Sequence, residues 1–281
     1  MTWRIPAKTF FLGEYAALYQ GSALILTTTP CFELSLTKHD AKPFHPHSPA
    51  GLFWHDQTFK KPGLIFHDPY QGLGGMGASS AQFIGAYLAA QTHNRELTNE
   101  ALWVTYRQYA QAEQGLLPSG YDVLAQTQQQ CVYINNAQCL DTLAWPFPNL
   151  SFVLVRSGIK LATHEHLIQQ TRALDTSALS DIVQNAYQAF LHQDENTIIN
   201  CVNDYQQALV SQHLTLEASL KKLNIWQKKI KALAAKGCGA LGADVWLFIV
   251  PRKNINHVLH TLRVEQLQIL ATEENIFQQF D

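Results

Sequence analysis

The chain has 281 residues, of which 47% are hydrophobic and 15% are charged, and its formal net charge at pH 7 is −2. This length and composition indicate a globular protein of one large or two ordinary domains and exclude a disordered chain. The 20 basic and 22 acidic residues nearly balance and form no basic stripe, which argues against nucleic acid or an anionic membrane as a partner.

The chain up to the first glycine-rich segment is rich in β-branched and aromatic residues. Strands are predicted at residues 9–12, 23–27, 32–37, 51–55 and 63–66. Helices are then predicted at 79–92 and 98–114, the second with Thr98 as its N-cap, and a short helix at 123–127 precedes a strand at 131–134. Residues 145–149 contain two prolines, which do not fit within regular strand pairing. The predicted domains are therefore 1–148 and 149–281.

The second half mixes helices and strands. A strand at 151–155 precedes a long helical stretch at 163–235, with breaks near Thr176 and at 192–194. The remaining elements are a strand at 245–250, a helix at 254–263 and a strand at 267–270. A strand-rich first half and a mixed second half predict an α+β protein of two closely associated lobes.

The five cysteines form no C-x-x-C pair, so neither a disulfide framework nor a zinc site is expected, and a reducing cytoplasm is the predicted location. The first six residues lack the apolar segment of a signal peptide, and the longest apolar run, 245–250, is too short to span a bilayer. The sequence leaves open whether the protein is a monomer or a homodimer.

Residues 72–81 (G-L-G-G-M-G-A-S-S-A) place four glycines in six positions before two serines and an apolar helical pattern. A glycine-rich loop lets backbone N–H groups approach a ligand, and the helix behind it adds unpaired N–H groups and the positive end of its dipole. This combination suits a polyphosphate, and Ser79 or Ser80 could cap the helix or coordinate Mg²⁺. Taken alone, a flexible serine-capped turn explains the stretch equally well. The lysine of the usual P-loop pattern is absent, so a nucleotide would bind here in another class of fold.

Three separated stretches, in this order and at this spacing, resemble the three signature motifs of the GHMP kinases, which include galactokinase, homoserine kinase, mevalonate kinase and phosphomevalonate kinase. The first motif comprises residues 6–8 and 13–16 (P-A-K and G-E-Y-A), the second is the glycine-rich loop, and the third comprises residues 236–244 (K-G-C-G-A-L-G-A-D). The resemblance covers nearly the whole chain. It implies a ribosomal-protein-S5-like N-terminal lobe, a ferredoxin-like C-terminal lobe, and ATP bound between them.

The resemblance also implies roles for individual residues. Residues 118–122 (P-S-G-Y-D) are similar to the segment that carries the catalytic aspartate of mevalonate and phosphomevalonate kinases. Asp122 is therefore expected to accept or orient the proton of the substrate hydroxyl, with Lys8 stabilising charge. The ATP phosphates are expected to contact Gly74, Gly75, Gly77, Ala78, Ser79 and Ser80. The substrate is expected to contact Glu14, Ser119 and Gly239.

Magnesium is expected to bind Ser79 or Ser80 together with a carboxylate. In mevalonate kinases the metal-binding glutamate lies eleven residues before the catalytic aspartate, where this chain has Gln111, whereas Glu113 lies nine residues before it. Glu113 is therefore the expected carboxylate ligand. A metal site at residues 164–166 (H-E-H) is rejected, because the i, i+2 spacing puts the two imidazoles on different faces of a helix.

Two kinds of function remain open. The motifs favour a kinase that transfers the γ-phosphoryl group of MgATP to mevalonate or phosphomevalonate in isoprenoid precursor synthesis, and residues 14–16 and 120–123 favour phosphomevalonate. The alternatives are a non-catalytic binding or regulatory protein with the same fold, or a kinase of another small hydroxyl or phosphate acceptor. The departures from the family pattern at Ala78, Gln111 and 241–243 favour the non-catalytic alternative.

Overall fold

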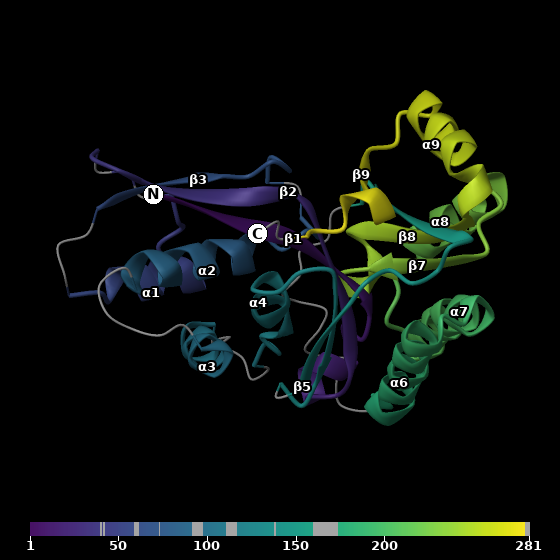
Figure 1. Cartoon of the computed structure of the whole chain (residues 1–281), viewed down its shortest axis with the longest axis horizontal. Coiled ribbons are helices and arrows are strands. Elements are labelled where there is room, and N and C mark those ends of the chain that lie inside the picture. The colour runs from purple at the N-terminus through teal and green to yellow at the C-terminus, as the bar shows by residue number, and fades with distance from the viewer. Residues whose placement is uncertain are drawn as a thin grey trace.

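The computed structural model describes residues 1–39, 41, 43–58, 62–72, 74–91, 98–110, 117–137, 139–159 and 174–278. Gln111, Glu113 and residues 164–166, which were singled out above, lie outside these ranges. Two antiparallel sheets with helices packed against them form two lobes, in agreement with the predicted α+β class (Figure 1).

The sheet of the N-terminal lobe is built around one long central strand. β2 (Ala23–Thr37) pairs along one side with β1 (Thr2–Leu12). On its other side β2 pairs with β3 (Gly63–His67) and with β4 (Cys131–Asn135), which in turn pairs with β5 (Cys139–Leu143). The two strands predicted between residues 23 and 37 are therefore one continuous strand.

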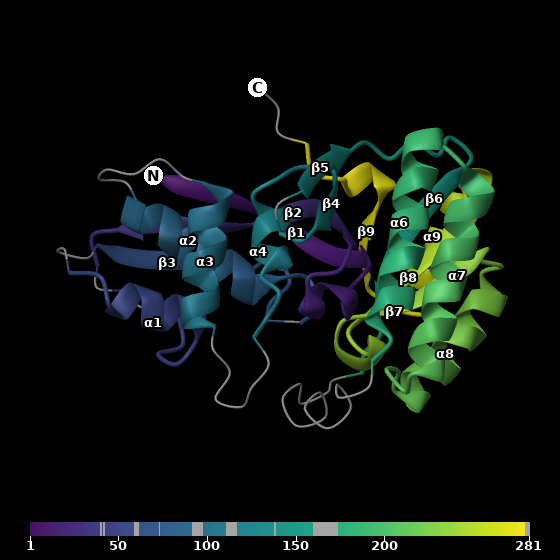
Figure 2. The ribbon, with the colours of Figure 1, turned by 90° about the horizontal axis from the view of Figure 1, so that it is seen from below.

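Four helices lie on one face of this sheet, below the long strands in Figure 1 and in front of them in Figure 2; α2 and α4 contact the strands, and α1 and α3 pack against these two helices. They are α1 (Pro49–His55), α2 (Ala78–Gln91), α3 (Asn99–Tyr109) and α4 (Tyr121–Gln126). The strand predicted at 51–55 is wrong: Ser48 caps a helix there by accepting the Gly51 N–H, and Pro49 suits the first helical position. Thr98 caps α3 as predicted, accepting the Ala101 N–H at 3.1 Å.

The sheet of the C-terminal lobe has the order β7-β8-β6-β9. Its strands are β6 (Leu150–Arg156), β7 (Ala234–Cys238), β8 (Val245–Pro251) and β9 (Ile269–Thr272). β7 begins within the stretch predicted as helical to residue 235. Every residue of β7 is buried, so its side chains pack on both faces of the sheet and show no helical period.

Helices cover both faces of this second sheet. α8 (Glu217–Lys229) and α9 (Ile255–Val264) pack on the face that presents Trp246 and Phe248, and α6 (Thr176–His192) and α7 (Glu195–Ser211) share a core with the opposite face. Alternate residues of β8 therefore belong to different cores, as the period of a strand requires. Within the described ranges, no helix combines the length and apolarity that crossing a membrane needs.

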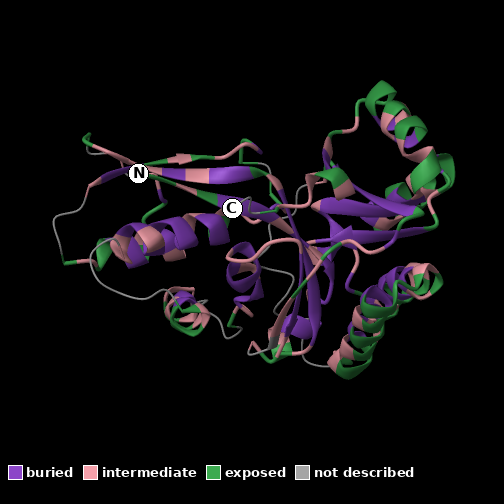
Figure 3. Cartoon of the chain, viewed as in Figure 1, coloured by how far each residue is buried: buried purple, intermediate pink, exposed green. Residues whose placement is uncertain are grey.

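The two lobes share one large hydrophobic core, seen in Figure 3 as buried residues that continue from one sheet to the other. Phe11 of β1 packs edge to face against Trp145 and Phe190, with ring centroids 6.0 Å apart in both pairs. Phe147 packs in the same way against Trp145, at 5.1 Å. Residues 144–149 thus join the last strand of the first sheet to the first strand of the second while contributing to the core. The division into domains 1–148 and 149–281 stays a prediction.

Candidate active site

Residues 74–77 (the glycine loop) are anchored to β1 by the one apolar side chain among them. Met76 is 1% exposed, and its Sδ accepts a hydrogen bond from Thr9 Oγ1 at 3.5 Å. Its carbonyl accepts the backbone N–H of Lys8 at 2.9 Å. Met76, which interrupts the glycines in the sequence, is therefore the residue that fixes the loop against β1.

Gly77 brings the loop into contact with the side chain of Lys8. Its φ of +87° lies in the left-handed region, and a Cβ there would come within 2.8 Å of Lys8 Cγ and 3.0 Å of Gln126 Nε2. Only glycine meets both conditions without strain. The aliphatic stem of Lys8 thus lies directly beside the glycine loop.

The two serines after the loop have different environments. Ser79 is exposed, whereas Ser80 is buried and its hydroxyl is engaged with Gln126 Oε1 at 2.5 Å and the Gly77 carbonyl at 3.0 Å. Among the described residues, none accepts a hydrogen bond from the backbone amides of residues 78–80. The start of α2 therefore offers unpaired N–H groups and one exposed hydroxyl, which is a suitable environment for an anion.

Gln126 is a structural residue that lies outside all of the sequence motifs. Its Nε2 donates to the carbonyls of Pro6, at 2.7 Å, and Gly77, at 3.2 Å, while its Oε1 accepts from Ser80. One buried side chain thus joins β1, the glycine loop, α2 and α4. Its only signal in the sequence is its place one helical turn after Asp122.

Asp122 lies inside the first turn of α4, whose N-cap is Gly120 in the left-handed conformation. An aspartate at the start of a helix is often its N-cap, but Asp122 is not, because Gly120 holds that position in α4. It shares a helix face with Gln126, four residues later, and that face meets β1 and the glycine loop. No described residue forms a hydrogen bond or ion pair with its carboxylate. The pKa of Tyr106 is raised, mainly because the tyrosine is buried and to a lesser extent because the negative charge of Asp122 is near.

Residues 119 and 120 shape the start of α4. The Ser119 hydroxyl accepts the Tyr121 N–H at 3.3 Å, and its carbonyl accepts the indole N–H of Trp103 at 2.8 Å. A Cβ on Gly120 would come within 2.7 Å of Trp103 Cδ1. These contacts orient the helix that carries Asp122, and the role of Ser119 as a substrate contact stays a prediction.

Glu14 forms a buried ion pair with Lys236 of β7. The Glu14 Oε1 to Lys236 Nζ distance is 2.5 Å, and the two side chains are 9% and 0% exposed. Burial by itself lowers the pKa of Lys236, but the neighbouring Cys238 and Glu14 outweigh it, so this pKa lies above its ordinary value. The pair is buried and joins a residue of the N-terminal lobe to one of the C-terminal lobe, so Glu14 helps to hold the two lobes together. Its predicted role as a substrate contact has no support from these contacts.

Tyr15 makes the neighbouring contact between the lobes. Its hydroxyl accepts the Leu241 N–H at 3.0 Å. The first and third motifs are thus joined at two adjacent residues, Glu14 and Tyr15.

Asp244, at the end of the third motif, lies between the two glycine-containing loops. A Cβ on Gly75 would come within 2.9 Å of Asp244 Cβ, and one on Gly74 would be 3.8 Å from Asp244 Oδ1. A Cβ on Gly239 would overlap Asp244 Oδ2. Gly239 therefore lies against the Asp244 carboxylate, and Asp244 was not among the predicted site residues. The contact of Gly239 with substrate stays a prediction.

Two cations face the same carboxylate from different lobes. Burial raises the pKa of Asp244, while the positive charges of Lys8 and Arg156 oppose that shift. Arg156 ends β6, and its Nη1 is buried without a hydrogen-bond partner among the described residues. The junction of the lobes therefore combines a carboxylate, two cations and the glycine loop.

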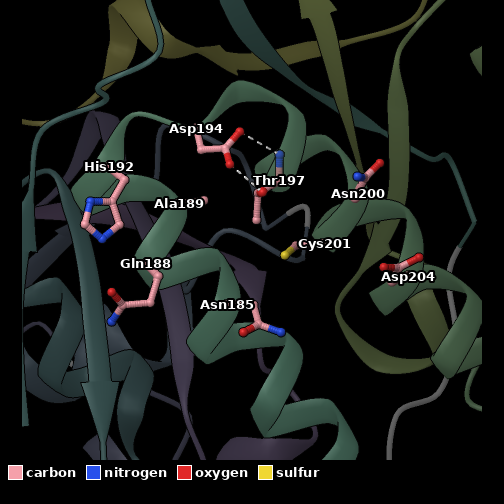
Figure 4. Close-up of a pocket in the computed structure, with 9 residues that line it drawn as sticks. All are labelled: Asn185, Gln188, Ala189, His192, Asp194, Thr197, Asn200, Cys201 and Asp204. Carbon is pink, nitrogen blue, oxygen red and sulfur yellow. Dashed lines mark hydrogen bonds between the residues drawn. The ribbon is translucent and has the colours of Figure 1, made fainter.

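A hollow of about 320 Å³ between α6 and α7 lies outside this junction (Figure 4). Its lining is polar and includes Asn185, His192 and Asp204. Asp194 at its rim is already engaged as the N-cap of α7, where it accepts the N–H groups of Asn196 and Thr197, each at 3.1 Å. No residue of the three motifs lines this hollow, so it is not assigned to the site.

No protein-family model matches the sequence, and no curated protein matches it either. The structure is similar to the mevalonate kinase of Methanococcus jannaschii, with a TM-score of 0.73 over 99% of this chain and 98% of that chain, at 14% identity. It is similar to the Streptococcus pneumoniae phosphomevalonate kinase in complex with phosphomevalonate and AMPPNP, with a TM-score of 0.76 over 97% and 99% of the chains, at 13% identity. It is also similar to the Lactococcus lactis galactokinase complexed with galactose, with a TM-score of 0.76 over 98% and 93% of the chains, at 10% identity. The chain therefore has the two-lobed fold of the GHMP kinases.

Proposed function

We propose that the chain is an ATP-dependent small-molecule kinase that phosphorylates mevalonate or phosphomevalonate in isoprenoid precursor synthesis. The observation that carries the proposal is the meeting of the glycine loop, the Lys8 side chain and the helix face of Asp122 around one buried residue, Gln126. Phosphoryl transfer needs a phosphate cradle, cationic charge and a base beside the acceptor. The similar S. pneumoniae enzyme, which is in complex with AMPPNP, supports ATP as the donor.

Each part of the reaction has a residue suited to it. The glycine loop and the free amides at the start of α2 would hold the phosphates. With mevalonate, the acceptor hydroxyl would attack the γ-phosphorus while its proton passes to the Asp122 carboxylate, and ADP would leave as the β–γ bridging bond breaks. With phosphomevalonate, an oxygen of its phosphate group would be the attacking atom, ADP would leave in the same way, and no hydroxyl proton would need to be removed. Lys8 would neutralise charge at the transferring group.

The oxygen donors near the loop fit a magnesium ion. When bound with nucleotide, Mg²⁺ would neutralise charge on the phosphate oxygens. Ser79 is the serine with an exposed hydroxyl, while the Ser80 hydroxyl is engaged elsewhere, so Ser79 is the suitable ligand of the two. Glu113 lies outside the described residues, and its role stays a prediction.

Substitutions of the two serines should have different effects, one on the stability of the protein and the other on metal binding. Ser80→Ala leaves the buried Gln126 Oε1 without its donor and should lower the free energy of unfolding by roughly 1–3 kcal/mol. Ser79→Ala should leave stability unchanged but raise the Mg²⁺ concentration needed for nucleotide binding. Thermal unfolding and Mg²⁺ titrations of ATP binding measure both effects. Superimposable Mg²⁺ titrations for wild type and Ser79→Ala would remove the hydroxyl from the metal site.

The acceptor should carry an anionic group. Lys8 and Arg156 both act on Asp244, and the buried Arg156 Nη1 has no described partner. A second cation near the site favours an acceptor with more than one negative charge, as phosphomevalonate has, over a neutral sugar.

ADP release should follow only when the correct acceptor is present. We expect release with mevalonate or phosphomevalonate, and none with galactose, with homoserine or with nucleotide alone. A coupled assay of ADP release with each acceptor measures this. Release with galactose or homoserine only would exclude the isoprenoid acceptors and leave the kinase proposal intact.

The alternative is a non-catalytic protein with the same fold. Leu241 is one of the departures from the family pattern that favour this alternative, but it has little effect on the conformation of its loop. Its φ is +51°, so the backbone keeps a left-handed conformation of the kind that glycine adopts easily. Tight ATP binding without transfer to any acceptor would favour the non-catalytic alternative.

A further inference from the structure

The Asp244 carboxylate poses an electrostatic problem if phosphates bind to the glycine loop. It contacts Gly75 and lies next to Gly74, so a polyphosphate held there would bring like charges together in a partly buried place. Within the described part of the chain, no residue donates a hydrogen bond to this carboxylate. Its oxygens are therefore available to a ligand.

The protein's own cations only partly offset this charge. Lys8 and Arg156 act on Asp244 from the two lobes, yet neither forms an ion pair within 4.0 Å of it among the described residues. A divalent cation between the carboxylate and the phosphates would turn this repulsion into attraction. Mg²⁺ is suited to that position, because it prefers hard oxygen donors and usually binds one or two carboxylates together with substrate phosphates.

On this basis we infer that Asp244 is a magnesium ligand, a carboxylate that the C-terminal lobe supplies to the metal of MgATP. The inference rests on the proposed function, since it requires nucleotide at the glycine loop. Ser79, in the first turn of α2, belongs to the N-terminal lobe, and Asp244 follows the third motif of the C-terminal lobe. A metal bound to both would link the lobes through the nucleotide.

The test compares nucleotide binding with and without metal. AMPPNP binding is measured by calorimetry in EDTA and in excess Mg²⁺ for wild type, Asp244→Asn and the control Asp181→Asn, which removes an exposed charge on α6. For wild type and the control we expect Mg²⁺ to strengthen binding. The ratio of AMPPNP affinity in Mg²⁺ to AMPPNP affinity in EDTA measures this effect. For Asp244→Asn we expect this ratio to fall by roughly tenfold or more, as loss of a group that supports a metal does. Binding in EDTA should stay equal or become tighter, because a repelling charge is gone.

A second measurement follows the metal itself. Electron paramagnetic resonance of Mn²⁺, used in place of Mg²⁺, should show tight binding to the wild-type complex with AMPPNP and weaker binding to the Asp244→Asn complex. Asp244→Ala, which removes every side-chain oxygen, should give the same results and replaces Asp244→Asn if that variant does not fold.

Two results would overturn the inference. In the first, Mg²⁺ increases the AMPPNP affinity of Asp244→Asn as much as that of wild type, while Asp244→Asn binds AMPPNP more tightly in EDTA. Asp244 would then be a counter-ion of Lys8 and Arg156, and the kinase proposal would stand. A wild-type protein that binds no AMPPNP under either condition would overturn the proposed function together with the inference.

Discussion

Lys236→Met should lower the free energy of unfolding by about 3–5 kcal/mol, as breaking one side of a buried ion pair does. The variant leaves the Glu14 carboxylate, which is 9% exposed, without its cation. Glu14 Oε2 already has no hydrogen-bond partner among the described residues, so little else can compensate for the charge. A loss of this size is a large fraction of the stability of a typical domain. Urea unfolding followed by circular dichroism measures it.

Two further variants test whether the buried pair is the cause. The double variant Glu14→Gln with Lys236→Met removes both charges and should recover much of the lost stability, since a neutral pair needs no counter-ion. Lys221→Met breaks the exposed pair with Glu217, whose side chains are 72% and 79% exposed, and should leave stability nearly unchanged. A double variant as unstable as Lys236→Met would show that packing of the lysine side chain, rather than its charge, holds the lobes.

With a hydroxyl acceptor such as mevalonate, Asp122→Asn should lower kcat by roughly 100-fold or more, the usual effect of losing a general base. Its carboxylate has no described hydrogen-bond partner and does not cap α4, so the amide should fit without loss of fold. The affinity for MgATP should stay near that of wild type, because the phosphates are held by the glycine loop and the start of α2. Steady-state kinetics with saturating acceptor, together with calorimetry of ATP binding, measure both quantities.

The outcome separates three roles for this residue. Full turnover in Asp122→Asn would show that the carboxylate neither accepts nor orients the proton. If both the melting temperature and the activity of Asp122→Asn fall, Asp122 has a structural role. A loss of kcat with unchanged melting temperature and ATP affinity is the result expected of a catalytic base.

Most elements with a strong local signal were predicted correctly. Thr98 begins α3 as its N-cap, and the apolar run at 245–250 is the strand β8. The errors arose where the signal was short: residues 51–55 are a helix because Ser48 and Pro49 start one, and β7 replaces the predicted end of a helix. A short apolar segment fits a buried strand or a buried helix equally well until its neighbours are known.

By itself the sequence determined the fold class, because the order and spacing of three motifs are properties of the chain and need no knowledge of contacts. It also determined that a glycine-rich loop precedes a helix, which is the local requirement for binding phosphate. Only the tertiary structure decided which serine is free. Ser79 and Ser80 are neighbours in sequence but point about 100° apart around α2, and the partner that engages Ser80 is Gln126, 46 residues away. The tertiary structure likewise decided that Glu14 pairs with Lys236, across 222 residues, and that Asp244 faces the glycine loop. Burial and pairing of charges depend on which surfaces meet, and local sequence patterns do not contain that information.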